Sequence, residues 1–284
     1  MCHIFLSINS KNPKNIIRKF FKLTEPTKSI DGYGIAYIKN NKWNVYKKPF
    51  QYIKDKNFSE KIKKMDGPIY IAHVREVDRN VSKKKLLEHS AVQNTHPFAY
   101  KNYIFAQHGS LHINHNNQLL LHQIYINNPK FVKIINSLKK YIEPSLKKKI
   151  KGITDSEVLF FLFLSIYNLF KKKYDCGEER LLLLSFYKIL HLLQKYKIEH
   201  NSNIVFSNGK FIIAANIYHT NNPDIILPID FYMDNTNGLI FSCIKCTNNS
   251  VLIERNTIHI INIESKSCNK YPFFQMKNNF LNIY

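Results

Sequence analysis

The sequence predicts an α+β fold in which antiparallel β-sheets are stacked and covered by helices. Three observations lead to this prediction: strand-like runs occupy both ends of the chain, helical patterns fill its middle, and no Gly/Ser/Pro-rich linker or internal repeat divides it. A chain of 284 residues is long enough to bury one large core. We therefore expect a single domain over residues 1–284.

The N-terminal part alternates strand-like runs with turns. A proline opens the run 13–22, whose apolar residues recur at helical spacing, so this segment predicts a helix. Asn40-Asn41 separates two apolar runs and predicts a hairpin. The strands expected in this part are residues 3–8, 34–37, 43–46, 68–75 and 102–107.

Helical patterns fill the middle of the chain. The helices expected there are residues 129–142, 155–172 and 178–197. Thr154 and Glu157 match a capping box at the start of the second helix, although Asp155 is itself a possible cap. Residues 158–170 are almost wholly apolar but too short to cross a bilayer, which indicates a buried helix.

The C-terminal part returns to strands. Asn208-Gly209 lies between two apolar runs and is a strong hairpin signal. The strands expected in this part are residues 203–207, 210–217, 225–232, 238–244 and 250–262.

The net charge is strongly positive, at +22 from 42 basic and 20 acidic side chains. Such an excess is typical of proteins that bind nucleic acid or anionic membranes. The lysines are spread in short runs over the whole chain, however, as expected when a biased genome favours Lys, Asn and Ile throughout. We therefore expect neither nucleic acid nor a membrane as a partner.

The five cysteines indicate a reducing compartment. Their number is odd and no secretory signal precedes them, so we expect free thiols in a cytoplasmic protein. Cys243 and Cys246 form a CxxC pair, but no second pair or ligand-spaced His pair lies nearby, so no zinc site is expected. The sequence predicts no other metal and no cofactor.

A cysteine follows the initiator methionine. Removal of Met1 would give Cys2 both a thiol and a free α-amine, and their ordinary pKa values of about 8.5 and about 8 allow proton transfer between them near neutral pH. A nucleophile that carries its own base is suited to attack on an acyl carbon. The same cysteine is also compatible with a plain position in the buried strand that follows.

Six short clusters occur in order through the first 157 residues. They are Met1-Cys2, Asp31-Gly32-Tyr33-Gly34-Ile35-Ala36, Ala72-His73-Val74-Arg75, Asn94-Thr95-His96-Pro97-Phe98, Phe105-Ala106-Gln107-His108-Gly109-Ser110-Leu111 and Gly152-Ile153-Thr154-Asp155-Ser156-Glu157. In this order they resemble the clusters of the class II glutamine amidotransferases, and most closely those of the stand-alone, YafJ-like subgroup. The resemblance implies a four-layer αββα sandwich of the N-terminal-nucleophile (Ntn) hydrolases. Within the second cluster we expect Asp31 to Gly34 to be structural, with glycines that allow a close approach to the nucleophile strand.

The resemblance implies roles for the residues around the nucleophile Cys2. Arg75 would bind the α-carboxylate of a glutamine-like substrate bidentately, and Asp155 would accept its α-ammonium. His96 would lie against the substrate, and Asn94 would fix the loop. Each binding residue has an alternative: a surface salt bridge for Arg75, a helix-dipole contact for Asp155, and a buried structural role for His96.

The oxyanion hole departs from the family pattern. Relatives carry His-Asn-Gly, in which the Asn side chain and the Gly backbone N–H stabilise the tetrahedral oxyanion, whereas this chain has Gln107-His108-Gly109. Gly109 is retained, and a neutral imidazole at His108 still offers one N–H donor. Loss of one such donor costs about 3–4 kcal/mol of transition-state stabilisation, so either His108 replaces the asparagine or the site is impaired.

These features predict an amidohydrolase that cleaves the side-chain amide of glutamine or of a γ-glutamyl compound through a thioester, releasing glutamate and ammonia or an amine. No synthetase domain fits in the remaining residues, so an ammonia acceptor would be absent or carried by a separate synthetase or partner subunit. A second hypothesis is a catalytically impaired relative that acts as a regulatory or partner-binding subunit. A basic nucleic-acid binder is the third, and its retention on DNA or RNA would depend steeply on salt.

Overall fold

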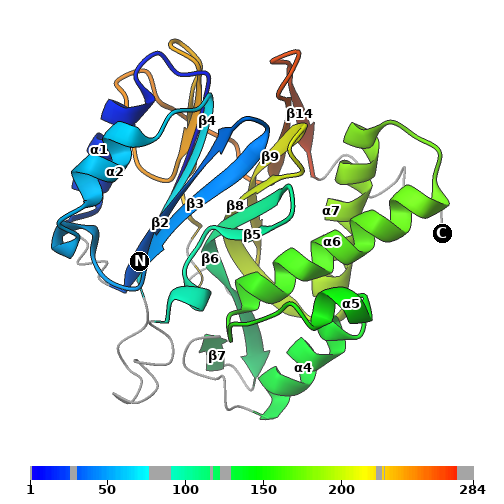
Figure 1. Ribbon diagram of the computed structural model, residues 1–284. Helices are drawn as coiled ribbons and strands as arrows, with labels where there is room; N and C mark the ends of the chain where they lie inside the picture. Colours follow the sequence, from blue (N-terminus) through cyan, green and yellow to red (C-terminus); the bar gives the residue numbers. More distant parts are fainter. Residues whose placement is uncertain are drawn as a thin grey trace.

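The computed structural model describes residues 2–25, 31–76, 91–115, 118–121, 129–221, 226 and 228–273. These residues form two stacked antiparallel sheets with helices on both outer faces, which gives four layers (Figure 1). The predicted α+β, αββα sandwich is therefore confirmed. Met1, whose removal the proposed nucleophile requires, lies outside the described residues.

The first sheet places the N-terminal strand near its centre. Its strands run in the order β12-β10-β11-β1-β4-β2-β3. Their bounds are β1 (His3–Ile8), β2 (Gly32–Lys39), β3 (Lys42–Lys48), β4 (Ile69–Arg75), β10 (Tyr232–Asp234), β11 (Leu239–Ser242) and β12 (Val251–Leu252). Because β1 pairs with β4 on one side and β11 on the other, the chain next to Cys2 is held from both sides.

The second sheet is built around β6 and β8. Its order is β14-β13-β9-β8-β6-β5, with β7 also paired to β6. The bounds are β5 (Phe98–Tyr100), β6 (Tyr103–His115), β7 (Gln118–Leu121), β8 (Ile198–Ser207), β9 (Phe211–His219), β13 (Thr257–Asn262) and β14 (Cys268–Pro272). β6 and β8 are longer than predicted because their polar halves also pair, with His108 opposite Asn203.

Helices cover the outer face of each sheet (Figure 1). The first sheet is covered by α1 (Pro13–Thr24) and α2 (Phe58–Lys64). On the outer side of the second sheet lie α4 (Pro129–Lys139), α5 (Pro144–Lys147), α6 (Asp155–Lys173) and α7 (Glu178–Lys195). Two short 3₁₀ turns, η2 (Tyr52–Lys54) and η3 (Val92–Asn94), lie in the connections.

Three apolar clusters fill the spaces between the layers. Ile4 and Leu6 of β1 belong to the cluster between the two sheets. Phe5 points the other way and packs on α1, where its ring centre is 5.4 Å from that of Phe20. β1 is therefore buried on both faces, which explains why residues 3–8 read as a nearly continuous apolar run.

The start of α6 agrees only in part with its predicted capping box. The Thr154 side chain caps the helix and accepts a hydrogen bond from the backbone N–H of Glu157 at 3.3 Å. The Glu157 carboxylate instead accepts hydrogen bonds from the N–H groups of Lys151 at 3.1 Å and Gly152 at 2.6 Å. One half of the box is thus present, and Asp155 is the first helical residue rather than the cap.

The C-terminal run predicted as one strand over residues 250–262 forms two strands. β12 ends at Leu252 and β13 begins at Thr257, after Asn256 has adopted a left-handed φ of 57°. Asn accepts this conformation more readily than most residues, so the chain turns there.

The strand predicted over residues 225–232 is wrong for residues 226 and 228–231. Regular pairing begins only at Tyr232. Pro228 has no N–H to donate to a ladder, which opposes a strand just before it. Residues 225 and 227 lie outside the described residues.

Five of the described helices and strands were not predicted from the sequence: α2, α5, β5, β7 and β14. α2 has seven residues, of which only Phe58 and Ile62 are buried. β14 is an edge strand with exposed or half-buried residues only. A short amphipathic turn and a polar edge strand both resemble loops in sequence.

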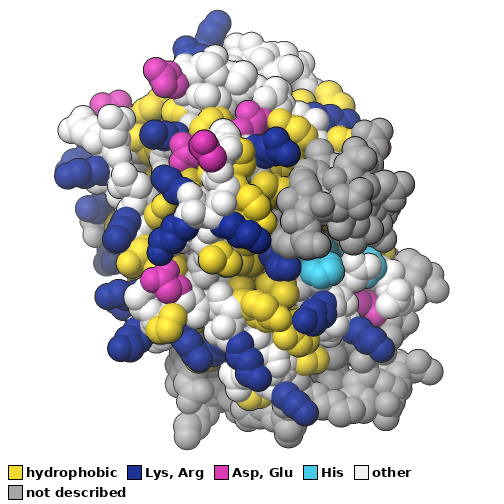
Figure 2. Space-filling view, turned by 90° about the vertical axis from the view of Figure 1, so that its right-hand side faces the viewer, with side chains coloured by type: hydrophobic (Ala, Val, Ile, Leu, Met, Phe, Trp, Pro, Cys, Tyr) yellow, Lys and Arg dark blue, Asp and Glu magenta, His cyan; other side chains and the backbone are white. Residues whose placement is uncertain are grey.

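The surface carries the basic excess in a dispersed form on the face that Figure 2 shows. Lysines and arginines alternate there with acidic and apolar side chains and form no single patch. Among the helices that the structure describes, none pairs sufficient length with sufficient hydropathy for a membrane crossing.

Candidate active site

Cys2 lies directly before β1, where the chain leaving β4 passes over its sulfur. The backbone N–H of Glu76 donates a hydrogen bond to Cys2 Sγ at 3.3 Å, and the thiol donates to the Glu76 carbonyl at 3.4 Å. Burial raises the pKa of the Cys2 thiol, while Arg75 lowers it and Asp31 and Asp155 raise it. At neutral pH the sulfur is therefore held as a thiol that needs a base.

Arg75 and Asp155 come to the same place from different layers. Arg75 is the last residue of β4 and is 4% exposed, which excludes a surface salt bridge. Asp155 is the first residue of α6 and is 6% exposed. Both side chains interact electrostatically with Cys2 and with each other. The fold thus brings together one sulfur, one guanidinium and one carboxylate from segments more than 70 residues apart in sequence.

The Asp155 carboxylate is fixed by backbone donors. One oxygen accepts a hydrogen bond from Leu111 N–H of β6 at 3.1 Å, and the other accepts one from Ser156 N–H at 2.8 Å. Asp155 therefore stabilises the first turn of α6, as its structural alternative required, and also ties that turn to the second sheet.

His108 and Gly109 lie in the middle of β6. The His108 ring is 2% exposed, neither ring nitrogen has a hydrogen-bond partner, and its centre is 5.7 Å from the centre of the His3 ring. Burial lowers the pKa of His108 well below its ordinary value, with His3 and His73 adding to the effect. His108 is therefore a neutral imidazole with one N–H to offer.

Gly109 is required by a close approach of the backbones of β6 and β8. Its φ is +127°, and a β-carbon there would lie 1.9 Å from the carbonyl oxygen of Asn201. No other residue type fits this position, because the clashing atom belongs to a paired strand.

The His96 ring is packed among other rings. It is 5% exposed, its centre lies 4.3 Å from that of His73 and 4.5 Å from that of Phe98, and both ring nitrogens are without partners. Burial lowers its pKa well below the ordinary value, and Arg75 contributes to that shift. The structure thus brings His96 near Arg75, in surroundings that suit both of its predicted roles.

Comparisons with known proteins identify this architecture. No protein-family model and no curated protein matches the chain. Among solved structures, a glutamine aminotransferase class-II domain protein from Silicibacter pomeroyi superposes with a TM-score of 0.59 at 16% identity, covering 96% of this chain and 99% of the other. The glutamine phosphoribosylpyrophosphate amidotransferase from B. subtilis gives the same TM-score at 13% identity, and an allosteric regulatory enzyme of purine biosynthesis does so at 14% identity.

The chain has the fold of the class II glutamine amidotransferases. It spans about half the length of the two larger enzymes, since the match covers 49% of each. At such low identity the likeness establishes the fold, an Ntn-type αββα sandwich.

Within this amidotransferase fold, two site histidines were not singled out from the sequence. His73 Nε2 donates a hydrogen bond across the sheets to the Gln107 carbonyl at 3.0 Å, and burial lowers the pKa of His73 to about 3. His3 has a pKa of about 4, again because of burial. The available signal for His73 was its spacing: it is two residues from Arg75 on one strand, so the two side chains share a face. His3 gave no such signal.

Asn94 fixes the loop around His96, as predicted. Asn94 Oδ1 accepts a hydrogen bond from Ile153 N–H at 2.9 Å, and a β-carbon on Gly152 would lie 2.3 Å from the same oxygen. A β-carbon on Gly34 would lie 2.1 Å from the His96 carbonyl oxygen. These glycines therefore let the loop around His96 pack against β2 and against the start of α6.

The CxxC pair packs beside the nucleophile strand. The backbone N–H of Ile4 donates to Cys243 Sγ at 3.3 Å, and His3 Nδ1 lies 3.5 Å from that sulfur. Cys246 is buried and contacts the Ser242 hydroxyl at 3.3 Å. Among the described residues, no group of three or more His, Cys, Asp or Glu side chains is arranged to hold a metal ion.

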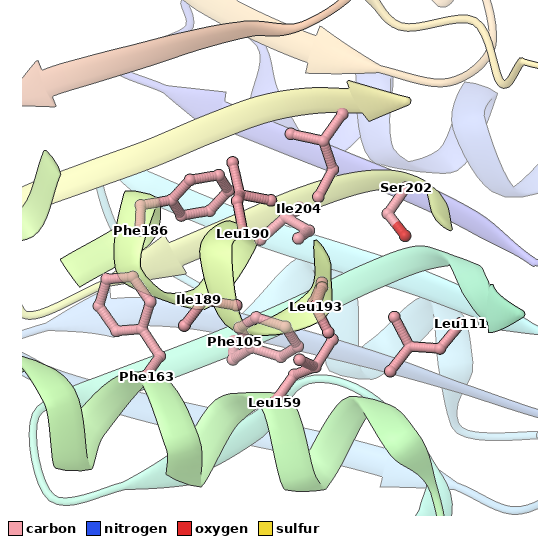
Figure 3. A pocket seen from close by; sticks show the side chains of 11 residues that line it. Phe105, Leu111, Leu159, Phe163, Phe186, Ile189, Leu190, Leu193, Ser202 and Ile204 are labelled. Carbon is pink, nitrogen blue, oxygen red and sulfur yellow. The ribbon is translucent and has the colours of Figure 1, made fainter. Parts of the chain in front are cut away.

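An apolar cavity of about 20 Å³ lies between the second sheet and the helices α6 and α7 (Figure 3). It has room for about one water, but Ser202 is the only polar side chain among its lining residues, so it is expected to be dry. Leu111 separates it from the Asp155 contact. The cavity is a packing defect of the core rather than a substrate site.

Proposed function

We propose that this protein is an Ntn cysteine amidohydrolase of the class II glutamine amidotransferase type, formed by one domain over residues 1–284. The observation that carries the proposal is the shared buried site of Cys2, Arg75 and Asp155. A guanidinium and a carboxylate near one sulfur match the two charged ends of an amino acid whose side chain is to be attacked.

The chemistry begins with removal of Met1. The freed α-amine takes the thiol proton, and Cys2 Sγ attacks the side-chain carbonyl of glutamine or of a γ-glutamyl compound. The tetrahedral intermediate collapses to a thioester as ammonia or an amine leaves with a proton from the α-ammonium. Water then cleaves the thioester, releases glutamate and restores the thiol. A base is needed because burial raises the pKa of the Cys2 thiol.

The donors proposed for the oxyanion are the Gly109 backbone N–H and the ring N–H of His108. The unpartnered ring nitrogens of His108 support this assignment, since a buried imidazole without a partner is costly unless a ligand completes it. In the substrate complex, Arg75 binds the α-carboxylate, Asp155 the α-ammonium, and His96 lies against the substrate.

The test uses purified protein whose intact mass establishes the state of Met1. Glutamine and a γ-glutamyl amide are supplied, and glutamate release is measured in the native protein and in Cys2→Ala, Cys2→Ser and Cys268→Ala. We expect release to be abolished in both Cys2 variants and retained in Cys268→Ala, which removes an exposed thiol. Unchanged release from Cys2→Ala would refute the assignment.

A second candidate function is a catalytically impaired regulatory or partner-binding subunit. The observation that favours it is the histidine at the usual asparagine position, whose ring differs from a carboxamide in reach and angle. A glutamine-like electrophile separates the two: it should modify Cys2 in the hydrolase and leave it unmodified in the impaired protein.

The remaining assignments are also proposals. A separate synthetase or partner subunit would supply the ammonia acceptor. The free state of all five cysteines supports a cytoplasmic site of action. The dispersed basic side chains in Figure 2 give no support to a nucleic-acid surface on that face.

A further inference from the structure

Asp31 lies next to Arg75, although the sequence indicated only a structural role for the segment Asp31 to Gly34. Its backbone N–H donates a hydrogen bond to the Arg75 carbonyl at 3.2 Å, and the next residue, Gly32, is paired opposite Arg75. Two successive residues, Asp31 and Gly32, therefore face the single residue Arg75. Asp31 is 6% exposed, and its carboxylate interacts electrostatically with the Arg75 guanidinium.

The Arg75 guanidinium requires a counter-ion because it is 4% exposed. A buried charge without a partner costs several kcal/mol. Two carboxylates interact with it electrostatically, Asp31 and Asp155. Asp155 is anchored to Leu111 of the second sheet and to its own helix turn, whereas Asp31 belongs to the same sheet as Arg75.

We propose that Asp31 is a positioning residue: it is the counter-ion that holds the Arg75 guanidinium beside Cys2 and leaves the Asp155 carboxylate available for an ammonium group. The role toward a substrate rests on the proposed function. The ion pair and its effect on Cys2 do not, so both can be tested without any substrate.

The charges around Cys2 support these separate roles for Asp31 and Asp155. Arg75 contributes one positive charge, and Asp31 and Asp155 contribute one negative charge each. Burial keeps Cys243 a neutral thiol by raising its pKa, and it keeps His3 and the other histidines of the site neutral by lowering theirs. These side chains leave one negative charge, and the positively charged amine at the N-terminus of the chain also acts on Cys2. The negative charge suits a single added cation, either the α-ammonium of a processed N-terminus or that of an amino-acid ligand.

The ion pair is tested by a double-mutant cycle in urea. Asp31→Asn, Arg75→Met and the double variant are unfolded in parallel, with Asp55→Asn and its combination with Arg75→Met as the matched control. Asp55 is also a buried aspartate of this sheet region, but its carboxylate is held by Tyr33 and Tyr46. We expect the Asp31/Arg75 double variant to unfold at a midpoint no lower than that of the worse single variant, and the Asp55 pair to be additive. Additive losses in the Asp31 cycle would overturn the counter-ion role.

The position beside Cys2 is tested by alkylation with iodoacetamide as a function of pH, followed on the Cys2 peptide by mass spectrometry. Asp31 raises the pKa of Cys2, and Asn removes that charge while its carbonyl oxygen still accepts a hydrogen bond from the guanidinium. We expect the midpoint for Asp31→Asn to move to lower pH, and that for Asp55→Asn to stay in place. A midpoint that stays or rises in Asp31→Asn would overturn the proposal, whereas absence of glutamate release would bear on the proposed function alone.

Discussion

The carboxylate of Asp155 accepts a hydrogen bond from the backbone N–H of Leu111 at 3.1 Å. Leu111 follows Gly109 by two residues on β6, so this contact ties the first turn of α6 to the strand that carries the proposed oxyanion donors. A single carboxylate therefore serves the packing of helix on sheet and is also placed to bind a substrate. Mutations at Asp155 have to separate these two roles.

Asp155→Asn should weaken binding while preserving the fold. The amide oxygen of Asn still accepts the Leu111 N–H, but the charge that would pair with an α-ammonium is lost. We expect KM for glutamine to rise about 10–100-fold, as for loss of a charge-assisted hydrogen bond. The urea midpoint should fall less than in Asp155→Leu, because Asn keeps the Leu111 contact and loses only the one with the Ser156 N–H. Asp155→Leu, which also loses the contact with the Leu111 N–H, is the control that should both raise KM and lower the urea midpoint. An unchanged KM in Asp155→Asn would show that the residue is structural only.

His108 can be tested in both directions. His108→Ala removes the proposed side-chain donor and should lower kcat by about 10²–10³-fold with little effect on KM. His108→Asn installs the donor that the family pattern carries and should keep kcat at or above the native value. Steady-state kinetics with glutamine decide the point, and native kcat in His108→Ala would exclude an oxyanion role for the ring.

Gly34→Ala should destabilise the protein by about 1–3 kcal/mol. The added β-carbon would lie 2.1 Å from the His96 carbonyl oxygen, so the loop or β2 has to move. Gly177→Ala is the matched control, because nothing lies within 4 Å of a β-carbon there and it should change stability by less than about 0.5 kcal/mol. The free energies of unfolding of both variants are measured in urea. Equal losses of stability would mean that the loop around His96 can move at little cost.

Stability should fall as the pH drops below about 6.5. Burial lowers the pKa of His3 to about 4 and of His73 to about 3, and it also lowers those of His96 and His108. Between these values and the ordinary pKa, the unfolded chain binds protons that the folded chain excludes. Each histidine therefore lowers the free energy of unfolding by up to about 1.4 kcal/mol for each unit by which the pH falls in this range.

Urea unfolding at pH 7 and pH 5 checks this dependence. His96→Gln removes one of the four titrating groups and should flatten the slope between the two pH values. A free energy of unfolding that is equal at pH 7 and pH 5 would contradict the burial of neutral histidines at this site.

Strong local patterns made most elements predictable. The apolar run of β1, the hairpin across Asn40-Asn41 and the long apolar stretch of α6 all form as expected. Weak patterns failed: β14 is polar because it is an exposed edge strand, and α2 buries only two side chains. A buried face requires apolar residues at regular spacing. Elements that bury few side chains therefore lack the periodic pattern from which helices and strands are predicted.

The sequence by itself determined the strand and helix pattern of this protein, the six ordered clusters and the residue types that an amide-cleaving site needs, because these features are local or depend only on chemistry. Only the tertiary structure decided that Asp31 lies beside Arg75, that four histidines are buried near Cys2, and that Asp155 is bound to β6. Those relationships join segments far apart in the chain. Which side chains meet across two sheets depends on strand order and on register, and no short stretch of sequence encodes either.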